Sequence, residues 1–228
     1  TAGPTYEAID PVRFIGNHSS AKMGFDIANE AANKGAEVIL VTGPTHLNVQ
    51  NSAIKLIRVI SAQEMYDACH EFYNSVDVAI AAAAVADYRP KNVANQKIKK
   101  NDTTFSIELE KTKDILASLG EKKKNQYLIG FALETENEIE HAKQKIQKKN
   151  LDLIVLNSLN DEGAGFGKAT NKVTFISKEF AIEPKELKSK ELKEITLDDF
   201  KLQHDFDIIW QKESIYADKY LSISKEFI

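Results

Sequence analysis

Short apolar runs alternate with segments of helical periodicity along most of the chain. The runs rich in β-branched and other apolar residues are typical of strands buried in a parallel sheet, at residues 37–43, 54–60, 76–87, 127–133 and 151–157. Apolar residues at helical spacing predict helices between them, at residues 23–34, from Ser61 onward and at about 137–149.

Two of the predicted helices carry end signals. Gly35 supplies the left-handed residue that commonly follows a helix. Ser61 and Glu64 have the spacing of a capping box, in which each residue satisfies a free N–H group at the start of a helix. These signals place a helix end near residue 34 and a helix start after Ser61.

Strands and helices that alternate with short connections favour a parallel sheet with helices on both faces. We therefore predict an α/β fold, a Rossmann-like three-layer sandwich with a mostly parallel central sheet and an additional small β segment. No repeat and no Pro/Gly/Ser-rich linker divides the chain, so residues 1–228 are predicted to form a single domain. From about residue 178 the chain becomes rich in Lys and Glu, and we assign this tail no chemistry.

Composition narrows the classes of function. No apolar run approaches the roughly 18 residues of a membrane span, and no signal-peptide pattern opens the chain, so we expect no membrane partner. A net charge of −4 argues against a general nucleic-acid binder. The single cysteine, Cys69, is most simply a buried thiol and fits a reducing compartment, so we expect a cytoplasmic location.

The stretch DPVRFIGNHSSAKMG, residues 10–24, places many hydrogen-bonding groups ahead of the first predicted helix. A helix N-terminus attracts anions, and Ser19, Ser20 and Lys22 would add side-chain donors for a phosphate. The alternative is ordinary capping by a Ser or Asn. Asn17 and Arg13 go beyond what a cap needs.

The segment AAAAVADYRP, residues 81–90, follows the third predicted strand. Ligands of open α/β sheets bind at the carboxyl ends of strands. Small residues there would let a flat ring approach the backbone closely, and Asp87 could bind a base, a ribose or a metal ion. The alternative is a tightly packed strand crossing followed by a turn.

Two lysine-rich segments are further candidates. QKIKK, residues 96–100, is either an exposed edge strand protected by positive charge or a mobile lid that brings an ammonium group to a triphosphate. In AKQKIQKKNLDL, residues 142–153, helical spacing places Lys145 and Lys149 on the border of the apolar stripe, whereas Lys148 points away. Most such lysines only extend along the surface.

Several common nucleotide and metal motifs are absent from the sequence. It has no G-x-G-x-x-G after a strand, no Walker A loop and no zinc-ligand spacing. GAGFG, residues 163–167, follows an acidic turn without opening a helix, which indicates a flexible connection rather than a phosphate loop.

Seven ordered blocks resemble the phosphopantothenoylcysteine synthetase family: TAGPTYEAIDPVRFIGNHSSAKMG, AAAVADYRP, KIKK, EKTKDIL, GFALET, KKNLDLIVLN and FGKATNKV. They span roughly residues 1–176, and the tail matches poorly. Ala21 stands where Gly is common, and Lys113 stands where Pro often occupies the first helical turn after a Thr cap. Because Ala and Lys are good helix formers, we expect both departures to be tolerated.

The resemblance implies a ligase of coenzyme A biosynthesis that forms a homodimer. Bacterial members use CTP: the carboxylate of 4′-phosphopantothenate attacks the α-phosphate, which releases pyrophosphate and leaves an acyl-cytidylate. The amine of cysteine then attacks the acyl carbon and expels CMP. Two anions meet in the first step, so Mg²⁺ and lysines are expected to offset their repulsion.

The resemblance also implies site residues. Lys97 matches the family's catalytic lysine. Asn17 matches the asparagine that contacts the acyl intermediate, and its amide could donate to the acyl carbonyl in the second step. Arg13 is expected to assist. The expected nucleotide contacts are Ala81, Ala82, Ala83, Asp87, Lys97, Lys113, Asp114, Ile115, Leu116, Phe131, Lys145 and Lys149. No metal ligand is assigned, and the preference for CTP over ATP does not follow from the residues.

Two other functions fit the same fold, since a fold does not determine a function. One is an NAD(P)- or flavin-dependent oxidoreductase, against which the missing glycine fingerprint counts. The other is a non-catalytic nucleotide-binding module, which would bind CTP without turning it over.

Overall fold

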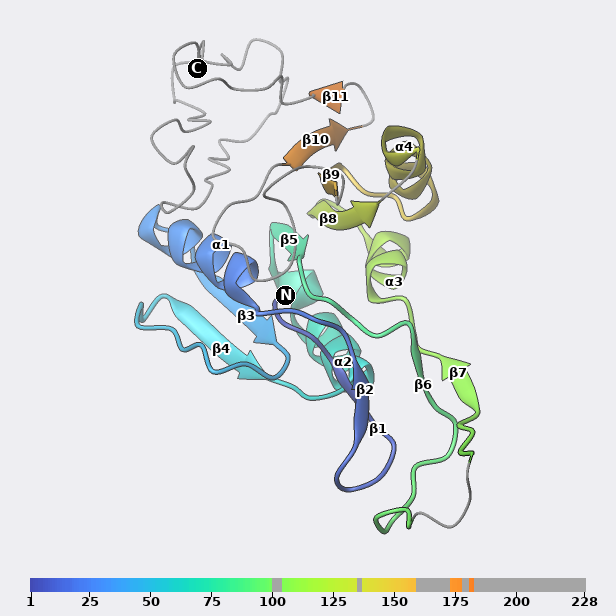
Figure 1. Ribbon diagram of the computed structural model, residues 1–228. Coiled ribbons are helices and arrows are strands. Elements are labelled where there is room, and N and C mark those ends of the chain that lie inside the picture. Colours follow the sequence, from blue (N-terminus) through green and yellow to red (C-terminus); the bar gives the residue numbers. More distant parts are fainter. Residues whose placement is uncertain (100–103, 135–136, 159–172, 178–180, 183–228) are drawn as a thin grey trace, which may run out of the picture.

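The computed structural model describes residues 1–99, 104–134, 137–158, 173–177 and 181–182 (Figure 1). The helices are α1 (Lys22–Asn33), α2 (Ala62–Phe72), α3 (Ile115–Lys122) and α4 (Glu138–Lys148), with a short 3₁₀ helix η1 (Tyr73–Ser75). The strands are β1 (Tyr6–Ala8), β2 (Phe14–Gly16), β3 (Val38–Thr42), β4 (Ile54–Arg58), β5 (Val78–Ala81), β6 (Tyr88–Pro90), β7 (Leu109–Lys111), β8 (Tyr127–Glu134), β9 (Leu153–Ser158), β10 (Val173–Ser177) and β11 (Ala181–Ile182). The GAGFG segment and nearly all of the Lys/Glu-rich tail lie outside the described residues, so the single-domain organisation stays a prediction.

The central strands are parallel, with an antiparallel edge. β3 pairs with β4, β5 with β8 and β8 with β9 in parallel register. β10 pairs antiparallel with β9, and β11 pairs antiparallel with β10. Residues 1–5 join the two groups: the N–H of Ala2 donates to Val41 at 2.9 Å, and the N–H of Ala84 donates to Gly3 at 2.8 Å. The result is the mostly parallel, mixed sheet that the sequence predicts.

Helices cover both faces of this sheet, because successive side chains of a strand point to opposite faces. On β3, Leu40 packs in a cluster with Phe25 of α1. The next residue, Val41, packs in a different cluster with Met65 of α2, which α3 and α4 also join. The predicted three-layer arrangement is therefore confirmed.

The additional small β segment consists of two antiparallel pairs, β1–β2 and β6–β7. Both pairs extend away from the main sheet on the same side of the molecule (Figure 1). They carry exposed aromatic and aliphatic side chains, among them Phe14, Tyr88 and Leu109.

Most predicted boundaries hold, and two differ in detail. Gly35 has the expected left-handed conformation, with φ +93°. The hydroxyl of Ser61 accepts the N–H of Glu64 at 3.2 Å, but the carboxylate of Glu64 bonds to the N–H of Ile60 at 2.6 Å rather than to that of Ser61. The strand predicted at residues 76–87 ends at Ala81, because the chain beyond it turns aside to pair with Gly3 and Thr5.

Candidate active site

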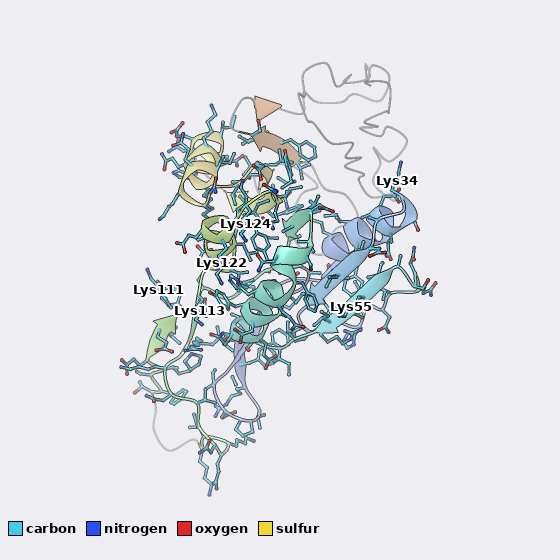
Figure 2. The ribbon with its side chains drawn as sticks, turned by 180° about the vertical axis from the view of Figure 1, so that it is seen from behind. Lys34, Lys55, Lys111, Lys113, Lys122 and Lys124 are labelled. Carbon is cyan, nitrogen blue, oxygen red and sulfur yellow. The ribbon has the colours of Figure 1, made fainter. Side chains whose placement is uncertain are left out.

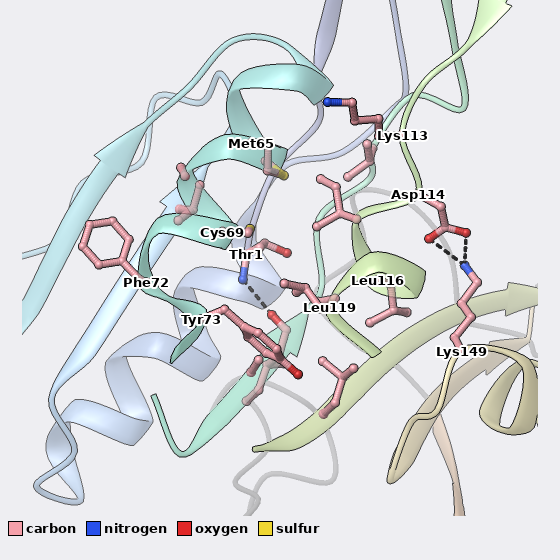
Figure 3. Close-up of a pocket in the computed structure, with 18 of the residues that line it drawn as sticks. Thr1, Met65, Cys69, Phe72, Tyr73, Lys113, Asp114, Leu116, Leu119 and Lys149 are labelled. Carbon is pink, nitrogen blue, oxygen red and sulfur yellow. Dashed lines mark hydrogen bonds and ion pairs between the residues drawn. The ribbon is translucent and has the colours of Figure 1, made fainter. Parts of the chain in front are cut away.

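A cavity of about 550 Å³ lies between α2, β5 and the start of α3 (Figure 3). Its inner wall is apolar and includes Met65, Leu119 and Leu128. Six of its polar lining residues come from the segment after β5, from β7 and the start of α3, and from the end of α4: Asp87, Lys111, Thr112, Lys113, Asp114 and Lys149. An apolar cavity with a few convergent polar groups is the usual form of a small-molecule site.

Seven of the expected nucleotide contacts meet at this cavity, although they come from four separate parts of the chain. They are Ala81, Asp87, Lys113, Asp114, Ile115, Leu116 and Lys149. Lys111 also lines the cavity and was not predicted. Lys111 stands two residues before Lys113 in the EKTKDIL block, so the sequence resemblance already included this residue.

Asp114 organises the start of α3. Its side chain accepts the N–H of Ala117 at 2.9 Å, as an N-cap does, and forms an ion pair with Lys149 at 2.8 Å. Desolvation alone would raise the pKa of Asp114, but the hydrogen bonds from Lys149 and Ala117 outweigh it and lower that pKa below its ordinary value. The carboxylate thus stays ionised and holds the Lys149 ammonium at the cavity.

The cap position corrects the expectation for Lys113. The sequence predicted Thr112 as the N-cap and Lys113 in the first helical turn, but α3 begins at Ile115 with Asp114 as its cap. The Thr112 hydroxyl instead donates to the carbonyl of Ala86 at 2.6 Å. Lys113 is therefore exposed outside the helix, with its ammonium 4.6 Å from the centre of the Tyr66 ring.

Another lysine, Lys122, is the last residue of α3. Figure 2 shows Lys111 and Lys113 beside β7 and Lys122 near the end of α3, whereas Lys34 and Lys55 lie on the opposite side of the molecule. The charged residues that line the cavity are three lysines, Lys111, Lys113 and Lys149, and two carboxylates, Asp87 and Asp114. The excess of lysine favours anionic ligands.

Asn17 lies next to the cavity but is not part of its lining. Its amide nitrogen donates to the carbonyl of Val85, a lining residue, at 3.0 Å, and more weakly to Ala84 at 3.4 Å. Because both contacts use the amide nitrogen, the amide oxygen is the atom turned to other partners in this geometry. The amide oxygen can only accept hydrogen bonds, whereas the role expected from the sequence has the Asn17 side chain donate one.

Arg13 and the Lys97 segment are joined to each other. The guanidinium of Arg13 forms an ion pair with the side chain of Asp10 and donates to the carbonyl of Ile98 at 3.1 Å. Lys97 itself is exposed and does not line the cavity. Residues 97–99 form neither a helix nor a strand, so the edge strand considered for them is not found.

The remaining expected contacts lie outside the cavity lining. Ala82 and Ala83 follow β5, where the N–H of Ala83 donates to the hydroxyl of Thr1 at 3.1 Å. Phe131 packs with Ile129 on the other face of β8 from the side chains that face α2. Lys145 is half-buried on α4, as its helical spacing predicts.

The start of α1 is not capped by a side chain. Ser19 accepts the N–H of Ala21 at 3.3 Å, and Ser20 accepts the N–H of Lys22, the first residue of α1, at 3.4 Å. Ala21 occupies the cap position in a left-handed conformation. The N-cap residue is therefore Ala21 and not a Ser or Asn, and phosphate binding by this segment stays a prediction.

Other chemistry receives no support from the described residues. Among them, no group of three or more His, Cys, Asp or Glu side chains is placed to hold a metal ion. Cys69 is half-buried in α2, and burial raises the pKa of its thiol, which makes it a poor nucleophile. Within the same part of the chain, no helix has the length and apolar character of a membrane span.

Comparison with known proteins gives a consistent family and fold. Residues 1–197 match the family model described as DNA/pantothenate metabolism flavoprotein C-terminal domain. The coenzyme A biosynthesis bifunctional protein CoaBC of Bacillus subtilis is 49% identical over 179 residues, which cover 78% of this chain and 44% of that protein. A protein of an unknown prokaryotic organism, named cysteine/cysteine sulfinic acid decarboxylase, is 53% identical over 190 residues, which cover 83% of this chain and 53% of that protein. The chain thus spans about half the length of the curated relatives it matches.

Solved structures share the fold. The crystal structure of the C-terminal domain of a coenzyme A biosynthesis bifunctional protein aligns with a TM-score of 0.67 at 48% identity, covering 82% of this chain and 84% of that one. The DNA/pantothenate metabolism flavoprotein of Streptococcus pneumoniae aligns with a TM-score of 0.71 at 25% identity, covering 79% and 88% of the two chains. Both alignments confirm the predicted α/β fold class.

Proposed function

Because the chain belongs to the DNA/pantothenate metabolism flavoprotein C-terminal domain family, we propose that it is a phosphopantothenate–cysteine ligase that uses CTP. The observation that carries this proposal is the meeting of Asp87, Lys113, Asp114 and Lys149 at one cavity beside β5. Their types and positions match those expected for a nucleotide site, and the relative from Bacillus subtilis is named for coenzyme A biosynthesis.

In the first step, a carboxylate oxygen of 4′-phosphopantothenate attacks the α-phosphorus of CTP. The bond to the pyrophosphate group breaks, and pyrophosphate leaves with its electron pair. Lys113 and Lys149 would bind the anionic nucleotide from two sides of the α3 start, and Lys97 would approach the triphosphate from the neighbouring segment. Their charge lowers the repulsion between two anions mainly by positioning and electrostatic stabilisation.

In the second step, the amine of cysteine attacks the acyl carbon, the bond to the CMP oxygen breaks, and the amine loses a proton. Asn17 lies at the carbonyl of Val85, so it is placed beside the nucleotide cavity rather than inside it. Its amide oxygen would accept a hydrogen bond from the incoming amine. We propose this acceptor role in place of the donor role expected from the sequence, because the amide nitrogen already donates to Val85.

The proposed reaction includes Mg²⁺ bound to the triphosphate, whose charge it offsets. Proteins usually bind Mg²⁺ through one or two carboxylates together with substrate phosphates, so the absence of a three-residue cluster among the described residues is compatible with it. Asp87 is an exposed carboxylate in the cavity lining and would share the ion. Asp114 is less suited, because Lys149 already engages it.

We also propose a homodimer in the cytoplasm. The two antiparallel pairs β1–β2 and β6–β7 expose Val12, Phe14, Tyr88 and Leu109, each between 44% and 60% exposed. Exposed apolar side chains of this size can mediate association between subunits. The free thiol of Cys69 fits a reducing compartment.

The test is pyrophosphate release from CTP, Mg²⁺ and phosphopantothenate, followed by CMP release when cysteine is added. We expect Lys97→Gln to slow pyrophosphate release on the order of 10²-fold, the scale seen when one preorganised electrostatic contact is removed. Lys91→Gln is the matched control, because Lys91 is an exposed lysine of the same loop that pairs with Glu108. Asn17→Ala should chiefly slow CMP release.

Several outcomes would contradict the proposal. If neither CTP nor ATP yields pyrophosphate, the ligase assignment is wrong. CTP binding without turnover would favour the nucleotide-binding module, and NAD(P) or flavin binding would favour the oxidoreductase. Carbon dioxide release from cysteine in the absence of CTP would favour the activity in the name of the relative at 53% identity.

A further inference from the structure

The side chain of Asp10 is fully buried, although the residue stands in a surface turn between β1 and β2. One carboxylate oxygen accepts the N–H groups of Val12 and Arg13, both at 2.9 Å, which closes the turn. The other oxygen accepts the Arg13 guanidinium, with Nε at 3.0 Å. These hydrogen bonds all lie within the turn itself. The carboxylate makes one further contact, outside the turn.

That contact reaches a distant part of the chain. The N–H of Ile98 donates to the second Asp10 oxygen at 3.1 Å. The carbonyl of the same residue accepts the Arg13 guanidinium at 3.1 Å. Nearby, the N–H of Ala94 donates to the carbonyl of Ile9 at 3.0 Å. Both polar groups of the Ile98 backbone are therefore held by one ion pair on the β1–β2 turn.

The two hydrogen bonds to Ile98 involve the peptide bonds that join it to Lys97 and to Lys99. The N–H of Ile98 belongs to the Lys97–Ile98 peptide, and its carbonyl belongs to the Ile98–Lys99 peptide. Since residues 97–99 have no helix or strand of their own, no ladder of backbone hydrogen bonds fixes them. Two charge-assisted contacts at one residue define both where the segment lies and how its peptide planes are turned.

We propose that Asp10 is a positioning residue for Lys97, and that Arg13 acts with it as the second half of a clamp on the Ile98 backbone. This inference rests on the proposed function of Lys97 and adds to it the residues that place this lysine. Arg13 then needs no contact with the substrate. Its substitution slows the first step because Lys97 loses its anchor.

A purely structural role for Asp10 predicts different behaviour. If Asp10 only stabilised the β1–β2 turn, its loss would lower overall stability without releasing residues 97–99 selectively. The Asp10→Asn variant tests the clamp because it removes the negative charge. Even an amide that turns its oxygen to Ile98 holds that N–H by a weaker, uncharged hydrogen bond.

The first measurement is amide hydrogen exchange, which needs no enzymatic activity. In Asp10→Asn we expect exchange of the Ile98 N–H to accelerate by roughly tenfold or more, the size that loss of a charge-assisted hydrogen bond produces. Exchange at Val155, in the buried strand β9, should stay unchanged. The control is Glu108→Gln, which removes an acid paired with Lys91 of the same loop but leaves Ile98 untouched.

A second variant covers the case in which Asp10→Asn folds poorly. Arg13→Gln removes the contact with the Ile98 carbonyl while leaving Asp10 in place. It should also accelerate exchange in residues 97–99. Unchanged Ile98 exchange in a folded variant, or equal acceleration at Ile98 and Val155, would overturn the clamp.

The second measurement is the dissociation constant for CTP. Asp10→Asn alone should weaken CTP binding. Added to Lys97→Gln it should have no further effect, because both changes remove the same interaction. Additive effects would show that Asp10 does not act through Lys97. If the wild type binds no CTP, the proposed function fails, while the exchange experiment still decides whether the clamp exists.

Discussion

Two residues at the ends of α1 adopt left-handed backbone conformations, Ala21 with φ 67° and Gly35 with φ 93°. This conformation brings a Cβ atom too close to the backbone and costs roughly 1–2 kcal/mol for residues other than Gly. Ala21 stands where the family commonly has Gly. The expectation that helix propensity makes Ala harmless there had the wrong premise, because Ala21 precedes the helix and must take the conformation that Gly prefers.

Gly35 allows this cost to be measured alone. A Cβ atom at Gly35 would meet no other atom within 4 Å, so a substitution changes conformation without a clash. The N–H groups of Gly35 and Ala36 bond to Ala32 and Ala31, both at 3.0 Å, which closes the end of α1. We expect Gly35→Ala to lower the free energy of unfolding by about 1 kcal/mol.

The control for this prediction is Gly35→Asn, since Asn tolerates the left-handed region better than Ala. Urea unfolding should rank the stabilities as Gly35, then Asn, then Ala. A destabilisation of the same size in both variants would show that something other than backbone conformation is lost. CTP binding should not change, because Gly35 lies far from the cavity lining.

At the scale of elements, the site depends on how closely α3 approaches the end of α4. A Cβ atom at Gly120 of α3 would lie 1.9 Å from the carbonyl oxygen of Lys149. The side chain of Asn150 donates to the carbonyl of Gly120 at 3.1 Å at the same crossing. This contact fixes the end of α4 against α3, which brings the Lys149 ammonium to Asp114.

Gly120→Ala should therefore destabilise the protein and weaken CTP binding together. A Gly-to-Ala change inside a helix is normally stabilising by up to about 1 kcal/mol. Here the new methyl group meets backbone, so we expect a loss of about 1–3 kcal/mol instead. Thermal unfolding and CTP titration would measure the two effects.

Lys149→Met separates the clash from the ion pair, because it removes the charge and keeps the backbone carbonyl. It should weaken CTP binding with a smaller loss of stability than Gly120→Ala. The double variant should still be destabilised by the clash, because Lys149→Met keeps the backbone carbonyl that the new methyl group meets. If Gly120→Ala were as stable as the wild type, the close crossing of α3 and α4 would not exist.

Elements were predictable where periodicity is strong. The helices at α1, α2 and α4 and the central strands follow from apolar spacing, and the end at Gly35 follows from a local signal. Asp114 as the cap of α3 did not follow, since Thr112 two residues earlier is also a common cap residue. Which of two neighbouring polar residues begins a helix was decided by the contact of Thr112 with Ala86.

At the scale of the whole molecule, the missed features are contacts between distant segments. Asp10 and Ile98 are 88 positions apart, and Lys149 and Asp114 are 35 apart. Periodicity and capping describe local structure and carry no information about such pairs. An Asp before a turn does predict local hydrogen bonding, so the turn at Asp10 was foreseeable, whereas its hold on Ile98 was not.

The packing of α2 against α3 also involves a distant pair that responds to pH. His70 of α2 lies with Nε2 2.9 Å from the Ser118 hydroxyl and Nδ1 3.3 Å from the Lys122 ammonium. Because Lys122 can only donate, Nδ1 accepts and the proton of a neutral ring resides on Nε2. Desolvation first, then the positive charges of Lys122 and Lys113, lower the pKa of His70, and Asp67 opposes this only partly.

A lowered histidine pKa makes stability fall as the solution becomes acidic. The unfolded chain binds a proton at His70 near pH 6.5, whereas the folded protein binds it only at a lower pH. The contribution of His70 is therefore present above about pH 6.5 and is lost as pH falls through the folded pKa. We expect the urea midpoint of the wild type to fall between about pH 7.5 and 5.5, and His70→Gln to reduce that fall. His46→Gln is the control, since His46 is exposed and should leave the wild-type slope intact. Equal slopes in the wild type and His70→Gln would mean that Lys122 and burial do not disfavour the charged ring, and that α2 and α3 pack independently of its protonation.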